Sequence, residues 1–277
     1  MSASSQDAVN ALEIQGASVA LASQGSGPPV LFLHGNPDTK ETWAEVMAAL
    51  SDAPLRCLAP DLPGFGASSP DPGPQTLERF AAWTAELATA LCGEESVHLV
   101  VHDVGGFYGL PFAASWPERV ASLTILNTLF WPDYRWHAFA RAWRTPLVGE
   151  LVMACANRWV FVNEVRRGSR GFPREVAEAA YTRVTPAARR TVLRLYRALD
   201  PAVFDPWEPR LLAASAQVPT RVIWGERDPY IPARFAERFG TELVERLPGV
   251  GHWPMVERPA LVAERIAQAA GVSRGPA

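Results

Sequence analysis

Short apolar segments alternate with longer amphipathic segments along most of the chain. Residues 29–33, 56–59, 98–101, 123–126, 221–224 and 243–247 are mostly apolar, as in strands buried on both faces of a parallel sheet. Residues 77–91 and 259–270 have apolar positions at helical spacing, and residues 11–14 and 19–22 indicate a hairpin that turns near Gly16. This alternation predicts an α/β fold in which helices cover a mostly parallel sheet.

The alternation stops between the predicted strands at 123–126 and 221–224. Residues 130–213 contain Trp- and Arg-rich helical segments and no convincing buried strand. A connection between neighbouring elements of an α/β unit is usually only a few residues long. We therefore expect a helical cap at 130–213, inserted into a core domain made of residues 1–129 and 214–277.

Composition narrows the classes of ligand. The formal net charge is −3, so we expect no basic surface for nucleic acid. Cys57, Cys92 and Cys155 lie far apart in the chain and lack the spacing of a metal site. Lys40 is the single lysine, which argues against a lysine nucleophile. We expect neither a metal nor a cofactor.

We expect that the first ten residues are not a secretory signal. Residues 1–10 are polar, without a basic segment followed by an apolar one. No apolar run approaches the ~20 residues that span a bilayer. Together with the dispersed cysteines, this predicts a cytoplasmic protein with no membrane partner, either a monomer or a homodimer.

Three acid–base residues directly follow predicted strands. Asp103 comes after 98–101, Asp228 after 221–224, and His252 after 243–247. Ligands of open α/β sheets bind beyond the carboxyl ends of the strands. The chain order Asp103, Asp228, His252 matches the order nucleophile, acid, histidine of nucleophile-elbow hydrolases. We expect the three side chains to meet at one rim of the sheet.

The sequence around Asp103 predicts a sharp turn from strand to helix. Gly105 and Gly106 follow Asp103, and small residues are needed where such a strained turn packs closely. Backbone N–H groups near Asn36 and Val104 are expected to form an oxyanion hole. The alternative interpretation is an ordinary strand-end aspartate that caps the next helix.

Two histidines beside these motifs are expected to have structural functions. His34 would brace the loop that carries Asn36. His102 precedes Asp103 in the predicted strand, so its side chain should point to the opposite side and pack.

His34-Gly35-Asn36-Pro37, His102-Asp103-Val104-Gly105-Gly106 and Gly251-His252-Trp253-Pro254 resemble motifs of the α/β-hydrolase superfamily, in particular its aspartate-nucleophile branch of haloalkane dehalogenases and epoxide hydrolases. The resemblance covers nearly the whole chain. It implies an α/β-hydrolase fold: a mostly parallel eight-stranded sheet flanked by helices, with the cap inserted after the sixth strand.

The aspartate predicts displacement at saturated carbon. Attack by a carboxylate on an acyl carbon would give an anhydride, whereas displacement gives an alkyl ester on Asp103. His252 would then activate water, and Asp228 would orient His252. Asn127 ends the strand where some dehalogenases carry their acid; because it is an amide, that function falls to Asp228.

The leaving group decides between the two subfamilies. Asn36 resembles the halide-holding asparagine of haloalkane dehalogenases, which predicts that the small apolar organic substrate is a small or medium haloalkane, hydrolysed to an alcohol and a halide. Those enzymes usually have tryptophan directly after the nucleophile, where this chain has Val104. Further halide donors would then come from the cap, where the candidates are Trp131, Trp136, Trp143 and Trp159.

Two alternatives stay open. An epoxide hydrolase would use cap tyrosines as proton donors, with Tyr181 and Tyr196 as the candidates. A ligand receptor on the same fold would keep the pocket without catalysis. Each of these tryptophans and tyrosines has packing in the cap as its simpler alternative.

Overall fold

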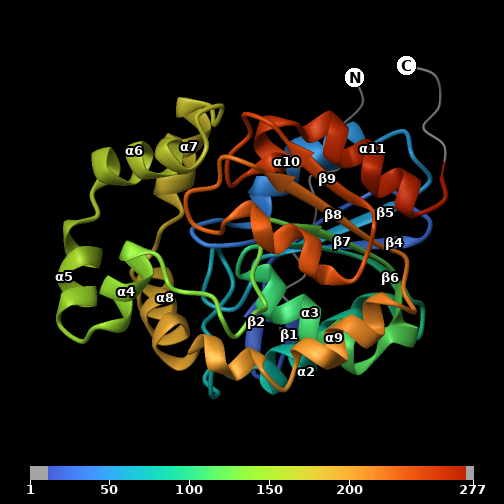
Figure 1. The fold of residues 1–277 in the computed structure, drawn as a ribbon, viewed down its shortest axis with the longest axis horizontal. Helices are drawn as coiled ribbons and strands as arrows, with labels where there is room; N and C mark the ends of the chain where they lie inside the picture. Colours follow the sequence, from blue (N-terminus) through green and yellow to red (C-terminus); the bar gives the residue numbers. More distant parts are fainter. Residues whose placement is uncertain (1–11, 273–277) are drawn as a thin grey trace.

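A central sheet with helices on both faces organises residues 12–272, the part of the chain that the computed structural model describes (Figure 1). The sheet order is β3-β5-β4-β6-β7-β8-β9. The pairing of β3 with β5 is antiparallel and the other pairings are parallel. The strands are β1 (Leu12–Ile14), β2 (Ala17–Val19), β3 (Leu21–Gln24), β4 (Pro29–Leu33), β5 (Arg56–Pro60), β6 (Val97–His102), β7 (Val120–Leu126), β8 (Thr220–Gly225) and β9 (Val244–Leu247).

The expected eight-stranded sheet has seven strands among the described residues, because the N-terminal hairpin forms a sheet of its own. β1 pairs only with β2, and the chain then continues into β3 of the main sheet. The break falls at Ala20, whose N–H donates to Oγ of Ser68 instead of to a strand. Ala11, the first residue of the predicted hairpin, lies outside the described residues.

Helices cover both faces of the sheet. Figure 1 shows α2, α3 and α9 on one face and α10 and α11 on the other, where α1 packs against them. The helices are α1 (Ala44–Ala49), α2 (Leu77–Cys92), α3 (Gly105–Ser115), α4 (Ala138–Arg144), α5 (Val148–Cys155), α6 (Arg158–Gly168), α7 (Arg174–Thr182), α8 (Pro186–Ala198), α9 (Glu208–Ser215), α10 (Pro254–Glu257) and α11 (Pro259–Ala269), with 3-10 turns at Lys40–Trp43, Pro117–Arg119, Pro201–Phe204 and Ala233–Phe239.

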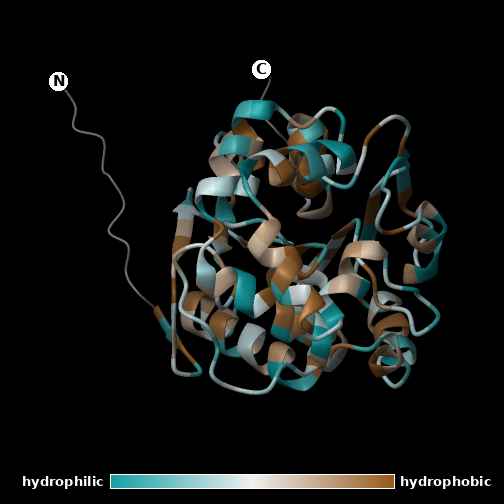
Figure 2. Ribbon diagram, turned by 90° about the vertical axis from the view of Figure 1, so that its left-hand side faces the viewer, coloured by the Kyte–Doolittle hydropathy of each residue, from teal (hydrophilic) through white to brown (hydrophobic). Residues whose placement is uncertain are grey.

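The strands bury apolar side chains on both faces. In β4, Leu31 and Leu33 join the core beneath α2 and α3, while Val30 and Phe32 join the core beneath α1 and α11. Successive side chains of a strand point to opposite faces, which explains why the sequence reads as a continuous apolar run. Figure 2 shows hydrophobic segments concentrated in the middle of the molecule and hydrophilic turns toward its periphery.

The long connection between β7 and β8 is helical, as its sequence predicts. It contains α4 to α9 and no strand within residues 127–219. Helices α4 to α7 lie together on one side of the molecule (Figure 1), whereas α9 packs on α3 beside the sheet. The domain bounds at residues 130 and 213 remain our interpretation. Among residues 12–272, no helix combines the length and the apolar character that crossing a membrane requires.

Candidate active site

Asp103 occupies a tight turn between β6 and α3. Its φ is +45°, a region that costs free energy for a residue with a side chain. The turn is packed so closely that a Cβ on Gly105 would lie 2.2 Å from the carbonyl oxygen of Leu33. Thr128 steadies the turn, because its hydroxyl donates to the Asp103 carbonyl at 2.6 Å. These features are those of the sharp turn from strand to helix that the sequence predicts.

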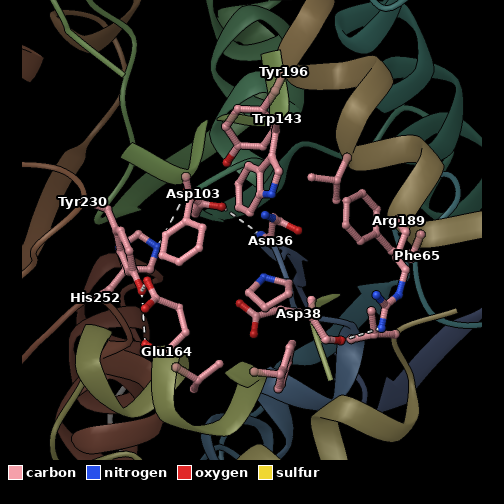
Figure 3. A pocket seen from close by; sticks show the side chains of 18 of the residues that line it. Asn36, Asp38, Phe65, Asp103, Trp143, Glu164, Arg189, Tyr196, Tyr230 and His252 are labelled. Carbon is pink, nitrogen blue, oxygen red and sulfur yellow. Dashed lines mark hydrogen bonds and ion pairs between the residues drawn. The ribbon is translucent and has the colours of Figure 1, made fainter. Parts of the chain in front are cut away.

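The three predicted acid–base residues meet at the carboxyl ends of their strands. Nδ1 of His252 lies 2.7 Å from Oδ2 of Asp228, and Nε2 lies 3.6 Å from Oδ2 of Asp103. His252 is therefore placed between a carboxylate that orients it and a carboxyl group that faces the cavity. Figure 3 shows Asp103 and His252 side by side on the cavity wall.

The opposite charges of Asp103 and His252 shift each other's pKa. Burial raises the pKa of Asp103, but the hydrogen bond and charge of His252 outweigh it and bring the pKa to about 2. Burial lowers the pKa of His252, but the carboxylates of Asp228 and Asp103 outweigh it and raise the pKa to about 10. Each of the two groups therefore favours the charged form of the other.

Backbone donors lie where an oxyanion hole is expected. The N–H of Asn36 donates to Oδ1 of Asp103 at 2.8 Å. Val104 stands at the N-cap of α3, where a backbone N–H has no partner within the helix. The Asn36 N–H thus contacts the Asp103 carboxyl group and can hold negative charge that develops on it, and the N–H of Val104, the next residue in the chain, stays the second expected donor.

His34 braces this loop as expected. Its Nε2 accepts from the N–H of Leu62 at 2.9 Å, and its Nδ1 lies 2.8 Å from the carbonyl of Gly35. A carbonyl only accepts, so Nδ1 carries the proton. The imidazole therefore joins the loop after β4 to the loop after β5.

One cavity in front of Asp103 is shared by core loops and the inserted helices. Asn36, Phe65 and His252 line it from the core, and α4, α5, α6 and α8 contribute the other walls. Most of its lining is apolar or aromatic. A carboxylate in such surroundings is poorly hydrated and therefore a better nucleophile.

The structure divides the predicted cap residues into two groups. Trp136, Trp143 and Tyr196 line the cavity. The indole nitrogens of Trp136 and Trp143 are buried and find no hydrogen-bond partner within the described chain. Figure 3 places Trp143 between Tyr196 and Asn36, with its ring nitrogen toward Asn36.

Trp131, Trp159 and Tyr181 do not line this cavity, which corrects the expectation for them. Trp131 is fully buried elsewhere, with its ring 5.0 Å from that of Phe239. Trp159 is 71% exposed, because it lies at the start of α6 outside the face that buries Val162 and Val165. Tyr181 packs on Phe161.

Several cavity residues were not singled out from the sequence. Asp38 follows Asn36 by two positions, and Tyr134 and His137 lie in the connection between β7 and α4. Tyr230 follows Asp228 by two positions, and its ring lies edge-on to His252 at 5.1 Å. Closeness in sequence to the predicted motifs was an available signal for Asp38 and Tyr230. Residues 12–272 contain no group of three or more His, Cys, Asp or Glu side chains placed to hold a metal ion.

Comparison with known proteins adds independent evidence. Residues 30–265 match the sequence profile described as "Alpha/beta hydrolase family". The chain is 31% identical over 262 residues to a haloalkane dehalogenase of Bradyrhizobium diazoefficiens, covering 83% of this chain and 82% of that protein.

Two solved structures have similar folds but different printed activities. An esterase from Thermogutta terrifontis has a TM-score of 0.76 at 27% identity, covering 94% of this chain and 97% of its own. An epoxide hydrolase from Vigna radiata has a TM-score of 0.77 at 20% identity, covering 94% of this chain and 96% of its own. The second likeness supports the fold alone.

Proposed function

The chain belongs to the alpha/beta hydrolase family, and from this premise we propose that it hydrolyses a haloalkane through a covalent ester on Asp103. The observation that carries the proposal is the carboxyl group of Asp103 on the tight turn between β6 and α3, 3.6 Å from Nε2 of His252 and facing an aromatic cavity. A carboxylate in this position displaces a leaving group from saturated carbon more readily than it attacks an acyl group.

In the first step, Oδ2 of Asp103 attacks the carbon that bears the halogen. The carbon–halogen bond breaks with its electron pair, so the negative charge moves from Asp103 to the departing halide. A halide in an apolar site needs hydrogen-bond donors. The side-chain amide of Asn36 and the unpartnered indole N–H of Trp143 lie together in the cavity and can supply them.

In the second step, water attacks the carboxyl carbon of the Asp103 ester. Ester formation removes one negative charge from beside His252, so the pKa of His252 falls and its proton can leave. Neutral His252 then takes a proton from the attacking water, while Asp228 stabilises the resulting imidazolium. The N–H groups of Asn36 and Val104 hold the tetrahedral oxyanion. When this intermediate collapses, the bond from the carboxyl carbon to the alkoxide oxygen breaks, the proton on His252 passes to that oxygen, and the alcohol leaves with the Asp103 carboxylate restored.

A second candidate function rests on Tyr196. Its side chain lines the cavity, and burial holds the pKa of its hydroxyl well above 10, so the hydroxyl keeps the proton that an opening epoxide must receive. Of the expected tyrosine pair only Tyr196 lines the cavity. Tyr134 also lines it, but its hydroxyl already donates to the carbonyl of Tyr230 at 2.9 Å.

A substrate panel tests the proposal. Bromoalkanes, fluoroacetate, aryl epoxides and p-nitrophenyl esters are incubated with the protein and with an Asp103→Ala variant, and halide, diol and phenol are quantified. We expect halide release from bromoalkanes that Asp103→Ala abolishes. Ester turnover that survives this substitution would overturn the nucleophile assignment. Diol formation without halide release would favour the epoxide alternative, and tight binding without turnover would favour a receptor.

A further inference from the structure

Asp38 is a buried carboxyl group in the cavity wall that the proposed mechanism does not use. It is 7% exposed, and its Oδ2 accepts from the indole N–H of Trp253 at 2.8 Å. The same oxygen lies 3.6 Å from Nδ1 of His102. Asp38 thus contacts Trp253 and His102, which are the sequence neighbours of the catalytic candidates His252 and Asp103.

The single hydrogen bond found for the His102 ring within the described chain shows which ring nitrogen carries the proton. Its Nε2 is 2.9 Å from the carbonyl oxygen of His252, and a carbonyl only accepts, so Nε2 carries the proton. In a neutral imidazole Nδ1 is then an acceptor, and it has no hydrogen-bond partner in the described chain. An ionised Asp38 would set two acceptors against each other in a buried site. A proton on Asp38 removes that conflict.

The electrostatics of both groups agree with this geometry. Burial, reinforced by the charge of Asp103, raises the pKa of Asp38 to about 7, although the Trp253 hydrogen bond opposes the shift. Burial lowers the pKa of His102 to about 3, so His102 stays neutral. The sequence predicted only packing for His102. In the structure its Nε2 also donates to the His252 carbonyl, and its Nδ1 faces Asp38 at 3.6 Å.

We propose that Asp38 is a positioning residue that holds a proton against His102, and that loss of this proton slows hydrolysis of the ester on Asp103. The proposal rests on the proposed function, because it concerns the step in which His252 activates water.

The surroundings of Asp38 explain the expected direction. The titratable groups that face it are His102 and Asp103 at the end of β6 and His252 in the loop before α10. Lys40, the nearest cation in sequence, is committed to Asp61 and Glu41. Lys40 is therefore not available to neutralise an ionised Asp38. The negative charge of Asp38 would stabilise the protonated form of His252, and that form cannot accept a proton from water. It also repels the negative charge that develops on the tetrahedral intermediate.

An Asp38→Asn variant tests the proposal, because an amide keeps an acceptor for Trp253, offers a donor to His102 and cannot ionise. The ester-hydrolysis rate is measured by single-turnover kinetics from pH 6 to pH 9. We expect the ratio of wild-type rate to variant rate to fall by about tenfold as pH rises through ~7, the effect of a coupling of one pKa unit. A ratio that does not change with pH would overturn the proposal. The matched control is Asp52→Asn, which removes an exposed carboxylate after α1 and should leave the ratio flat.

A second measurement is independent of any substrate. The side-chain carboxyl ¹³C resonance of Asp38 is assigned through the backbone of the wild-type protein and followed over the same pH range. A midpoint near 7 supports a protonated Asp38 beside His102, and a midpoint near 4 overturns it. If haloalkanes are not turned over while Asp38 titrates near 7, the proposed function fails and the protonation of Asp38 stands.

Discussion

The side-chain amide of Asn127 donates a 2.7 Å hydrogen bond to Oδ2 of Asp228. The same carboxylate oxygen is hydrogen-bonded to Nδ1 of His252, and the other oxygen accepts hydrogen bonds from the backbone N–H groups of Tyr230 and Ile231. Asn127 is itself fixed, because its Oδ1 accepts from the N–H of Gly225 at 2.9 Å. Strand β7 thus helps to orient the acid that strand β8 supplies.

Replacing Asn127 by aspartate tests this arrangement. Asn127→Asp places a second carboxylate within hydrogen-bond distance of Asp228. Either one of the two carboxyl groups then holds a proton, or their negative charges repel each other. Loss of one buried hydrogen bond to a charged group costs about 1.5–3 kcal/mol. We expect kcat to fall roughly ten- to a hundredfold at pH 7, measured by steady-state kinetics. The same measurement is made on Asn127→Leu, which removes the hydrogen bond and cannot itself act as an acid, and an unchanged kcat in Asn127→Leu would show that Asn127 does not orient Asp228.

Asp228→Asn separates the two steps of the reaction. Its amide cannot stabilise an imidazolium, so we expect ester hydrolysis to slow by at least about a hundredfold. Ester formation needs only the Asp103 carboxylate and should be affected much less. Rapid-quench kinetics should therefore show a burst of halide equal to the enzyme concentration. Equal slowing of both steps would contradict the assignment of Asp228.

The halide site is tested by Trp143→Phe, which keeps an aromatic ring and removes the N–H donor. We expect kcat/KM for a bromoalkane to fall about ten- to a hundredfold, because a buried anion loses a hydrogen bond worth about 1.5–3 kcal/mol. Trp131→Phe is the matched control, since Trp131 has an equally unpartnered buried nitrogen but does not line the cavity. Equal losses in both variants would argue for packing instead of halide binding.

Asp38 also predicts how stability depends on pH. Its pKa rises from the ordinary 3.8 to about 7 in the folded state, so the folded protein binds this proton more tightly than the unfolded chain does. The stabilisation is complete below about pH 4 and is lost as pH rises to about 7, a change of ~4 kcal/mol for about three pKa units. Urea unfolding should show a steeper loss in the wild type than in Asp38→Asn over this range. Parallel curves would contradict the raised pKa.

The sequence predicted the sheet well because its strands are buried on both faces. The predicted strand at 29–33 coincides with β4, and those at 98–101 and 221–224 lie within β6 and β8. A loop that follows such a strand must open at the same rim. That rule was enough to bring Asp103, Asp228 and His252 together.

The cap was less predictable, for a physical reason. Its helices have one face on the cavity and another on neighbouring helices or solvent, and aromatic residues occur on each. Trp143 and Trp159 therefore look alike in sequence, although one lines the cavity and the other is exposed. The function of Asp38 depends on the tautomer of His102, which only the contact with the His252 carbonyl reveals.

The covalent ester on Asp103 is the central claim, and mass spectrometry of a trapped intermediate tests it most directly. A His252→Gln variant can still form the ester but lacks the base that activates water for its hydrolysis. After incubation with 1-bromobutane, we predict that the peptide containing Asp103 gains the mass of one butyl group, and that fragmentation places the group on this residue. An unmodified Asp103 peptide, or a butyl group on another residue, would contradict the mechanism.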